Sequence, residues 1–111
     1  MMEQRNRVVQ VSRFGDPETQ SILVRMETDL TEICNAMLDG TLSDIAIRWR
    51  PGSSACVVLA SEGYPTKPRT GDVINGLEQA GSLPGVNIFH AGTARNVDGA
   101  LTAGGRVLGV T

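Results

Sequence analysis

TDLTEICNAMLDG, residues 28–40, is the one strong helical pattern in the chain, and it decides the fold class that the sequence predicts. Apolar residues recur at the i, i+3, i+4, i+7 and i+8 spacing of a single helix face; they are Leu30, Ile33, Cys34, Met37 and Leu38. Thr28 suits the N-cap, and Gly40 suits the C-terminal end. Asp29 and Glu32 fall in the first turn, where the helix dipole favours negative charge. The pattern predicts an amphipathic helix between Thr28 and Gly40.

The segments around this helix carry strand and turn patterns. Ile45, Ile47 and Trp49 alternate with other residues and predict a half-buried strand, whereas the apolar run 55–60 predicts a strand buried on both faces. Weaker strand patterns, a turn and a short helical start complete the chain; they are 8–11, 73–74, 86–89, two strands around Gly104-Gly105, a hairpin turn at 96–99, and a helical turn opening at Pro17. With one strong helix, the sequence predicts an α+β fold of short, largely antiparallel strands in a barrel-like or sandwich-hybrid arrangement, with one main amphipathic helix.

Size and composition limit the classes of function. The 111 residues form one domain, 41% of them apolar, and the net charge of −2 includes no basic stripe of the kind that binds nucleic acid. The longest apolar run is too short to cross a membrane, and no secretory signal opens the chain, so we expect a cytoplasmic protein. Cys34 and Cys56 lie in apolar runs and are interpreted as reduced core residues rather than as a disulfide or a metal pair.

Five blocks from Arg13 onward match a known family; they are Arg13–Gln20, Ser61–Pro65, Thr70–Ile74, Phe89–Thr93 and Thr102–Thr111. Through these blocks, which occur in the family's order, the chain resembles the phosphoribosylamine–glycine ligase (glycinamide ribonucleotide synthetase) family. The resemblance implies an ATP-grasp enzyme that uses ATP and magnesium to join glycine to 5-phosphoribosylamine. It divides the chain into residues 1–12, a lead-in with the remnant of an ATP-grasp end, and residues 13–111, a C-terminal domain that stops before the family's own end.

Three departures from the family pattern shape what we expect of this chain. It is too short to hold the ATP-grasp subdomains, so no ATP site is expected in it. The family's magnesium ligands align with Val9 and Val11, which have no oxygen to offer a hard cation, so we expect no metal ligand and no cofactor here. An uncovered apolar face is expected where the family continues, and its partner would be a second copy of the chain or the missing ATP-grasp half.

The resemblance also implies site residues, each with a structural alternative. Arg13 matches an arginine near the acyl phosphate and is the catalytic candidate, in an ancestral role only; alternatively it pairs with Asp16 or Glu18 to shape a turn. Asp16, Glu18 and Thr19 match the stretch that lines the substrate pocket. Alternatively, Asp16 begins a turn and Glu18 stabilises a helix N-terminus.

Cations further along the chain complete the candidates. Arg106 follows Gly104-Gly105 and matches an arginine that reaches the ribose 5-phosphate; alternatively it is a solvated residue of a hairpin turn. His90, the only histidine, is interpreted as a structural residue at a strand end. Lys67 and Arg69 are interpreted as part of a solvated face.

The sequence therefore indicates a C-terminal-domain fragment of the ligase type, inactive by itself. The alternative is a stand-alone oligomeric interaction or ligand-binding module derived from that domain. A ribose phosphate is the expected ligand, and neither nucleic acid nor membrane is an expected partner.

Overall fold

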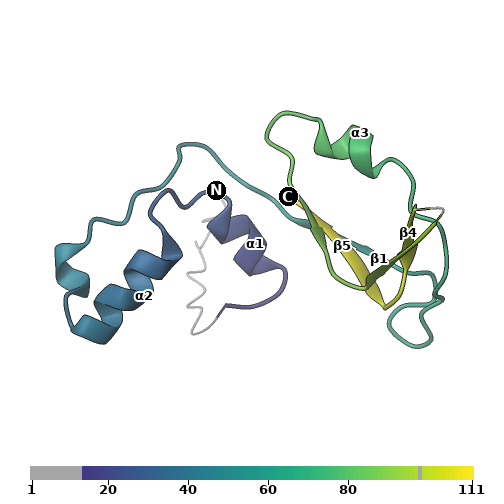
Figure 1. Cartoon of the computed structure of the whole chain (residues 1–111), viewed down its shortest axis with the longest axis horizontal. Coiled ribbons are helices and arrows are strands. Elements are labelled where there is room, and N and C mark those ends of the chain that lie inside the picture. The colour runs from purple at the N-terminus through teal and green to yellow at the C-terminus, as the bar shows by residue number, and fades with distance from the viewer. Residues whose placement is uncertain (1–13, 98) are drawn as a thin grey trace, which may run out of the picture.

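The computed structural model describes residues 14–97 and 99–111, and these form an α+β fold, as predicted (Figure 1). Arg13 and the predicted strand at 8–11 lie outside the described residues. The elements are α1 (Glu18–Leu23), α2 (Leu30–Asp39), the 3₁₀ helix η1 (Leu42–Asp44), β1 (Val57–Ala60), α3 (Leu77–Gly81), β2 (Ile88–His90), β3 (Thr93–Asn96), β4 (Gly99–Thr102) and β5 (Arg106–Val110). The described strands form two small sheets, so the expected barrel-like arrangement is wrong.

Helix α2 is the predicted amphipathic helix, with a different N-cap. The side chain of Asp29 accepts a hydrogen bond from the backbone N–H of Thr31 at 2.7 Å, and this bond lowers the pKa of Asp29 below its usual value. Thr28 is instead buried, and its hydroxyl accepts from the backbone N–H of Arg48 at 2.8 Å. Gly40 ends the helix in the left-handed conformation, with φ of 71°, as its position predicts.

Only part of the apolar face of α2 is covered. Ile33 and Ala36 are buried, but Cys34, Met37 and Leu38 are exposed, Leu38 by 86%. Cys34 is therefore not a core residue, because α2 packs mainly against the short η1 rather than on a sheet. Both cysteines are free thiols.

The predicted strand at 45–49 is wrong. Trp49 forms a single bridge with Met26, flanked by hydrogen bonds that link Glu27 to Arg48 and Arg50 to Arg25. The alternating pattern finds only the short connection between α1 and α2 as a partner, which is too short for a ladder.

The three-stranded sheet has the order β1-β5-β2, and both pairings are antiparallel. The central strand β5 holds Val107 and Leu108, both buried. Strand β1 was expected to be buried on both faces, but it lies at an edge of the sheet, and Val57 is 61% exposed. A strand at an edge has a neighbour on one side only, which explains this error.

The second sheet is the hairpin β3–β4, which turns between Asn96 and Gly99 as predicted. The two strands predicted around Gly104-Gly105 are β4 and β5, but they belong to different sheets. Val73 forms only a single bridge, with Leu101. Helix α3, which packs beside β2, was not predicted because its five residues are too few to show a helical period.

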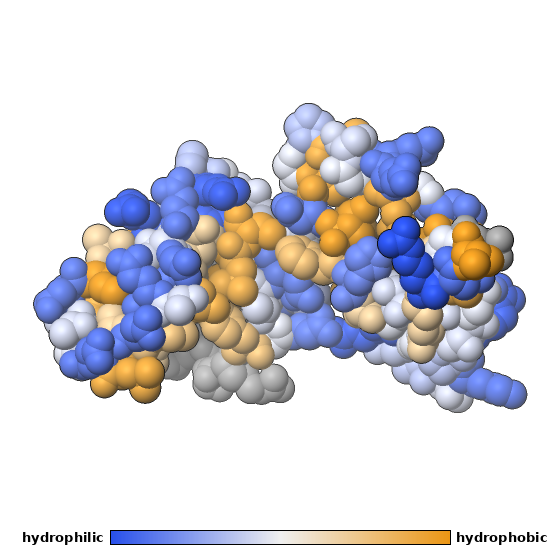
Figure 2. Space-filling model, viewed as in Figure 1, coloured by the Kyte–Doolittle hydropathy of each residue, from blue (hydrophilic) through white to orange (hydrophobic). Residues whose placement is uncertain are grey.

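The helical part and the sheet part of the chain lie side by side with little shared core (Figure 1). The radius of gyration is 18.0 Å, against about 13 Å for a compact domain of this length. Large apolar side chains are exposed in both parts; they include Phe14, Met37, Leu38, Trp49, Val57, Leu59, Val73, Leu83 and Phe89. On the face that Figure 2 shows, orange areas lie between polar ones in both parts. No described helix is long and apolar enough to cross a membrane.

Candidate functional site

Asp16 and Arg106, two of the predicted site residues, meet in the structure although 90 positions separate them. Asp16 lies in the turn that precedes α1, and Arg106 is the first residue of β5. The guanidinium Nη2 forms an ion pair with Oδ2 of Asp16 and donates to the Asp16 carbonyl oxygen at 2.9 Å. Hydrogen bonding to Asp16 raises the pKa of Arg106 above its usual value, with a smaller contribution from Tyr64. Arg106 is therefore a paired strand residue, and its interpretation as a solvated hairpin residue is wrong.

A hollow of about 50 Å³ lies at this ion pair, between α1 and the three-stranded sheet. Gln20 of α1 lines it and donates from Nε2 to Oδ1 of Asp16 at 3.2 Å. The other amide atom, Gln20 Oε1, is buried without a hydrogen-bond partner. Gln20 was not among the predicted site residues, although its position four residues after Asp16, one helical turn along, is a readable signal.

Glu18 and Thr19 fold back on their own turn rather than toward Arg106. The Thr19 hydroxyl donates to the Gly15 carbonyl oxygen, and the Glu18 carboxylate covers Gly15 so closely that a Cβ there would collide with it. Both contacts shape the start of α1.

Close packing around the turn before Arg106 requires glycine at two positions, Gly105 and Gly92. A Cβ at Gly105 would lie 2.6 Å from Cδ2 of Tyr64, and a Cβ at Gly92 would lie 2.8 Å from the Cα of Gly104. The ring of Tyr64 therefore rests against the chain at Gly105, and the two glycine-containing loops touch backbone to backbone. This packing fixes the path of the chain into Arg106.

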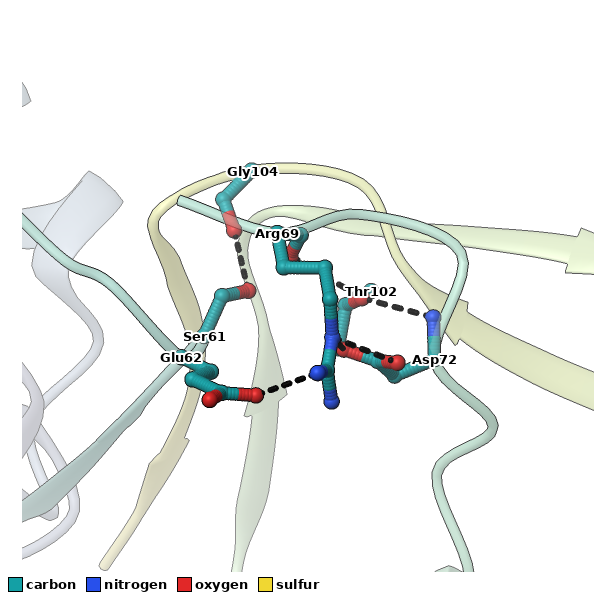
Figure 3. A network of polar contacts seen from close by, with 6 residues as sticks. All are labelled: Ser61, Glu62, Arg69, Asp72, Thr102 and Gly104. Atoms are coloured by element: carbon teal, nitrogen blue, oxygen red, sulfur yellow. Dashed lines mark hydrogen bonds and ion pairs between the residues drawn. The ribbon is translucent and has the colours of Figure 1, made fainter. Parts of the chain in front are cut away.

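Two buried hydroxyl residues, Ser61 of the loop between β1 and Val73 and Thr102 at the end of β4, link this loop to the chain beside the turn that leads into Arg106 (Figure 3). Ser61 donates from its hydroxyl to the Gly104 carbonyl oxygen at 2.7 Å and from its backbone N–H to the Gly105 carbonyl oxygen at 2.8 Å. At the other end of the loop, Thr102 Oγ1 accepts from the backbone N–H of Asp72 at 3.0 Å. The loop is thus anchored on both sides of the turn that leads into Arg106.

Arg69 closes this loop by joining its two ends. Its guanidinium forms ion pairs with Glu62 and with Asp72, the latter at 2.8 Å (Figure 3). The hydrogen bond with Asp72 is the main reason that the pKa of Arg69 lies above its usual value. Arg69 is therefore not merely part of a solvated face, since it holds the loop that packs on the Arg106 turn.

A comparison with known protein families shows which part of the chain these features belong to. The family profile described as "Phosphoribosylglycinamide synthetase, C domain" matches residues 54–111, which include all five described strands, the Arg69 loop and Arg106. The chain belongs to this family. Asp16 and α1 precede the matched region, so the Asp16–Arg106 ion pair joins the phosphoribosylglycinamide synthetase C domain to the segment before it.

Relatives named phosphoribosylamine–glycine ligase match most of the chain. The chain is 50% identical over 101 residues to the protein of Vigna unguiculata, covering 89% of this chain and 32% of the relative. It is 50% identical over 100 residues to the protein of Mesorhizobium japonicum, and 46% identical over 101 residues to that of Brucella melitensis, each time covering 90% of this chain and 23% of the relative. The chain thus spans about a quarter to a third of the length of these relatives.

Within this C domain, His90 lies between two hollows. Its Nδ1 is 3.0 Å from Thr93 Oγ1, a contact that orients the ring at the end of β2. The ring borders both the Arg106 hollow and an open groove of about 800 Å³ between β3 and the start of α3. Sequence reasoning missed this groove, because α3 was not predicted.

Among residues 14–97 and 99–111, no three His, Cys, Asp or Glu side chains gather closely enough to hold a metal ion. Val9 and Val11 lie outside these ranges.

Proposed function

We propose that this chain serves as the C domain of a phosphoribosylamine–glycine ligase and that Arg106 binds the 5-phosphate of the ribosyl substrate. The observation that supports this is the position of Arg106 at a hollow, on a turn fixed by Tyr64 and by the Arg69 loop. A guanidinium offers a planar set of donors that matches phosphate oxygens. Family membership supplies the reaction class.

In the proposed reaction, the γ-phosphoryl group of ATP is transferred to the glycine carboxylate, which gives glycyl phosphate and releases ADP. The amine nitrogen of phosphoribosylamine then attacks the acyl carbon and loses a proton, the bond from that carbon to the phosphate oxygen breaks, and inorganic phosphate leaves as glycinamide ribonucleotide forms. Activation belongs to an ATP-grasp part, and none of the residues described here belongs to it. Arg13 would lie near the acyl phosphate. Asp16 would border the ribosyl substrate, and Arg106 would hold its phosphate. Glu18 and Thr19 would shape the turn that carries Asp16.

The partner that we propose is that ATP-grasp part, in a cytoplasmic ligase of purine biosynthesis. Two observations support it: the matched segment is only 32% and 23% of the length of the first two relatives, and large apolar side chains lie exposed on both parts of the chain (Figure 2). Exposed apolar area of this extent is typical of a surface that another chain or segment covers. Without that partner we expect no ligase activity.

Calorimetry with glycinamide ribonucleotide tests the ligand. We expect binding to the purified chain that Arg106→Ala abolishes and Arg48→Ala leaves unchanged, because Arg48 carries the same charge on an exposed segment away from the hollow. Absence of binding at millimolar ligand, or equal losses in both variants, would refute a phosphate site at Arg106.

The alternative is a stand-alone oligomeric module, which the same exposed apolar side chains favour. Sedimentation velocity over a hundredfold range of concentration distinguishes the two. A defined dimer or tetramer that is inactive with a supplied ATP-grasp half would favour the module. Ligase activity restored by mixing with that half would favour the C domain.

A further inference from the structure

The Arg106 guanidinium already holds an anion in this structure, and that anion belongs to the chain itself. Oδ2 of Asp16 forms the ion pair with Nη2, and the Asp16 carbonyl oxygen accepts from the same nitrogen at 2.9 Å. A phosphate that approached Arg106 from the hollow would compete for these donors. In this structure Asp16 therefore occupies the Arg106 donors that an anionic ligand would need, and such a ligand would have to replace it.

The closed arrangement, in which Asp16 is paired with Arg106, is open to solvent, and one polar atom beside it has no hydrogen-bond partner. The side chains of Asp16 and Arg106 are 60% and 35% exposed, so solvent and small anions reach the pair. Gln20, which is hydrogen-bonded to Asp16, leaves its Oε1 buried without a partner. A buried acceptor without a donor raises the free energy of the closed arrangement, and movement of the Asp16 turn would let that oxygen meet water.

We propose that Asp16 is an internal competitor for the anion site: its carboxylate occupies Arg106 when no ligand is present, and a bound phosphate displaces it. This inference rests on the proposed function, since it assumes that Arg106 binds phosphate. The ion pair also joins the turn before α1 to β5, so displacement releases that turn from the sheet. Binding at Arg106 is thereby coupled to the position of α1.

The size of the effect follows from the exposure of the pair. Ion pairs between exposed groups are weak, so removal of the Asp16 charge should tighten phosphate binding by about two- to fivefold rather than by orders of magnitude. The change Asp16→Asn removes the charge, keeps the size, and leaves the backbone carbonyl contact of residue 16 in place.

The test is calorimetric titration of the full chain with inorganic phosphate, comparing wild type with Asp16→Asn. Asp39→Asn, the same substitution at the remote end of α2, serves as the control. We expect about two- to fivefold tighter binding in Asp16→Asn only. In an Arg106→Ala background, where binding is expected to be lost, the Asp16→Asn change should not restore phosphate binding, because the guanidinium for which the carboxylate competes is absent. Thermal unfolding of each variant checks that it is folded.

The outcomes separate the two ideas. Equal or weaker phosphate binding in folded Asp16→Asn, with binding lost in Arg106→Ala, overturns the competitor and leaves the proposed phosphate site standing. An equal gain in Asp39→Asn shows a general charge effect and also overturns the competitor. No phosphate binding in any variant overturns both.

Discussion

Gly105 lies directly beneath the ring of Tyr64, and this single contact makes a sharp prediction. A methyl group at Gly105 would lie 2.6 Å from Tyr64 Cδ2 and 3.1 Å from Pro68 Cγ, so the ring or the turn must move. We expect Gly105→Ala to destabilise the fold by about 1–3 kcal/mol, as overpacking usually does. Urea denaturation measures this.

Gly81 provides the control for that substitution. A Cβ there meets only Ile88 Cδ1, at 3.9 Å, and Gly81 is the last residue of α3. Gly81→Ala should leave stability unchanged or slightly raised, because alanine is the better helix former. A loss in Gly81→Ala as large as that in Gly105→Ala would contradict the packing explanation.

Asp29 makes a pH-dependent contribution to α2. Its pKa in the folded chain is lowered by the hydrogen bond from Thr31, so its stabilising effect is present above the unfolded pKa, near 3.8, and is lost as pH falls through the lower folded value. Asp29→Asn keeps a cap that does not titrate, whereas Asp29→Ala removes the cap. We expect melting temperatures at pH 7 to fall by a few degrees in Asp29→Ala.

Thermal melts at pH 7 and pH 3 check the sign. The part of the acid-induced loss that is due to Asp29 should be absent in Asp29→Asn. An identical pH dependence in wild type and Asp29→Asn would show that this carboxylate contributes nothing.

Features of single residues were predictable when they depend only on neighbours in the sequence. Gly40 ends α2 because of its own backbone freedom, and a Pro17 helix start needs only local chemistry. Thr28 was misjudged because its hydroxyl is used by Arg48, 20 positions away, which no local rule reports. The pairing of Asp16 with Arg106 was equally out of reach, although the resemblance named both residues.

Strand β5 carries the best-buried side chains, and this makes it the most sensitive element. Leu108 is 3% exposed and lies between the two edge strands. We expect Leu108→Ala to cost about 2–5 kcal/mol, from lost transfer free energy and a residual cavity. Chemical denaturation of the purified variant gives the value.

Leu38 is the matched comparison for that element. It is a leucine of α2 with 86% of its surface exposed. Leu38→Ala should therefore change stability by no more than about 0.5 kcal/mol. A large loss at Leu38 would mean that the apolar face of α2 is covered in solution, for example by a second copy.

Helices and strands were easier to predict when they were long, or when they paired with a segment close by in the sequence. The ten residues of α2 show a full helical period, and the β3–β4 hairpin pairs across a short turn. The segment 45–49 has the alternation of a strand but finds no second strand among the described residues, and β1 has the composition of a buried strand but an edge position. Pairing partners far along the chain decided both cases.

At the scale of the whole molecule, the sheet and the helical part differ in how well they are packed. Within the described part of the chain, the four buried apolar side chains are two in α2 and two in β5, and only the latter lie within a hydrogen-bonded sheet. Local opening requires less free energy where few contacts are broken. We expect backbone amides of β5 to exchange with deuterium more slowly than those of α2.

Hydrogen exchange with mass spectrometry measures this difference peptide by peptide. Equal protection of the two segments would indicate that the helical part is supported by contacts absent from this single chain. A rise in α2 protection with protein concentration would identify that support as self-association.

The sheet order β1-β5-β2 has a consequence for the order of synthesis. The central strand is the last of the three in sequence, so β1 and β2 lack their neighbour in the sheet until Arg106–Val110 have been made. A ribosome adds about 5–20 residues per second, which leaves the uncharged strand Val57–Ala60 without its partner for several seconds. During that interval the nascent chain exposes an unpaired apolar strand, and a chaperone that binds extended apolar segments would bind this one.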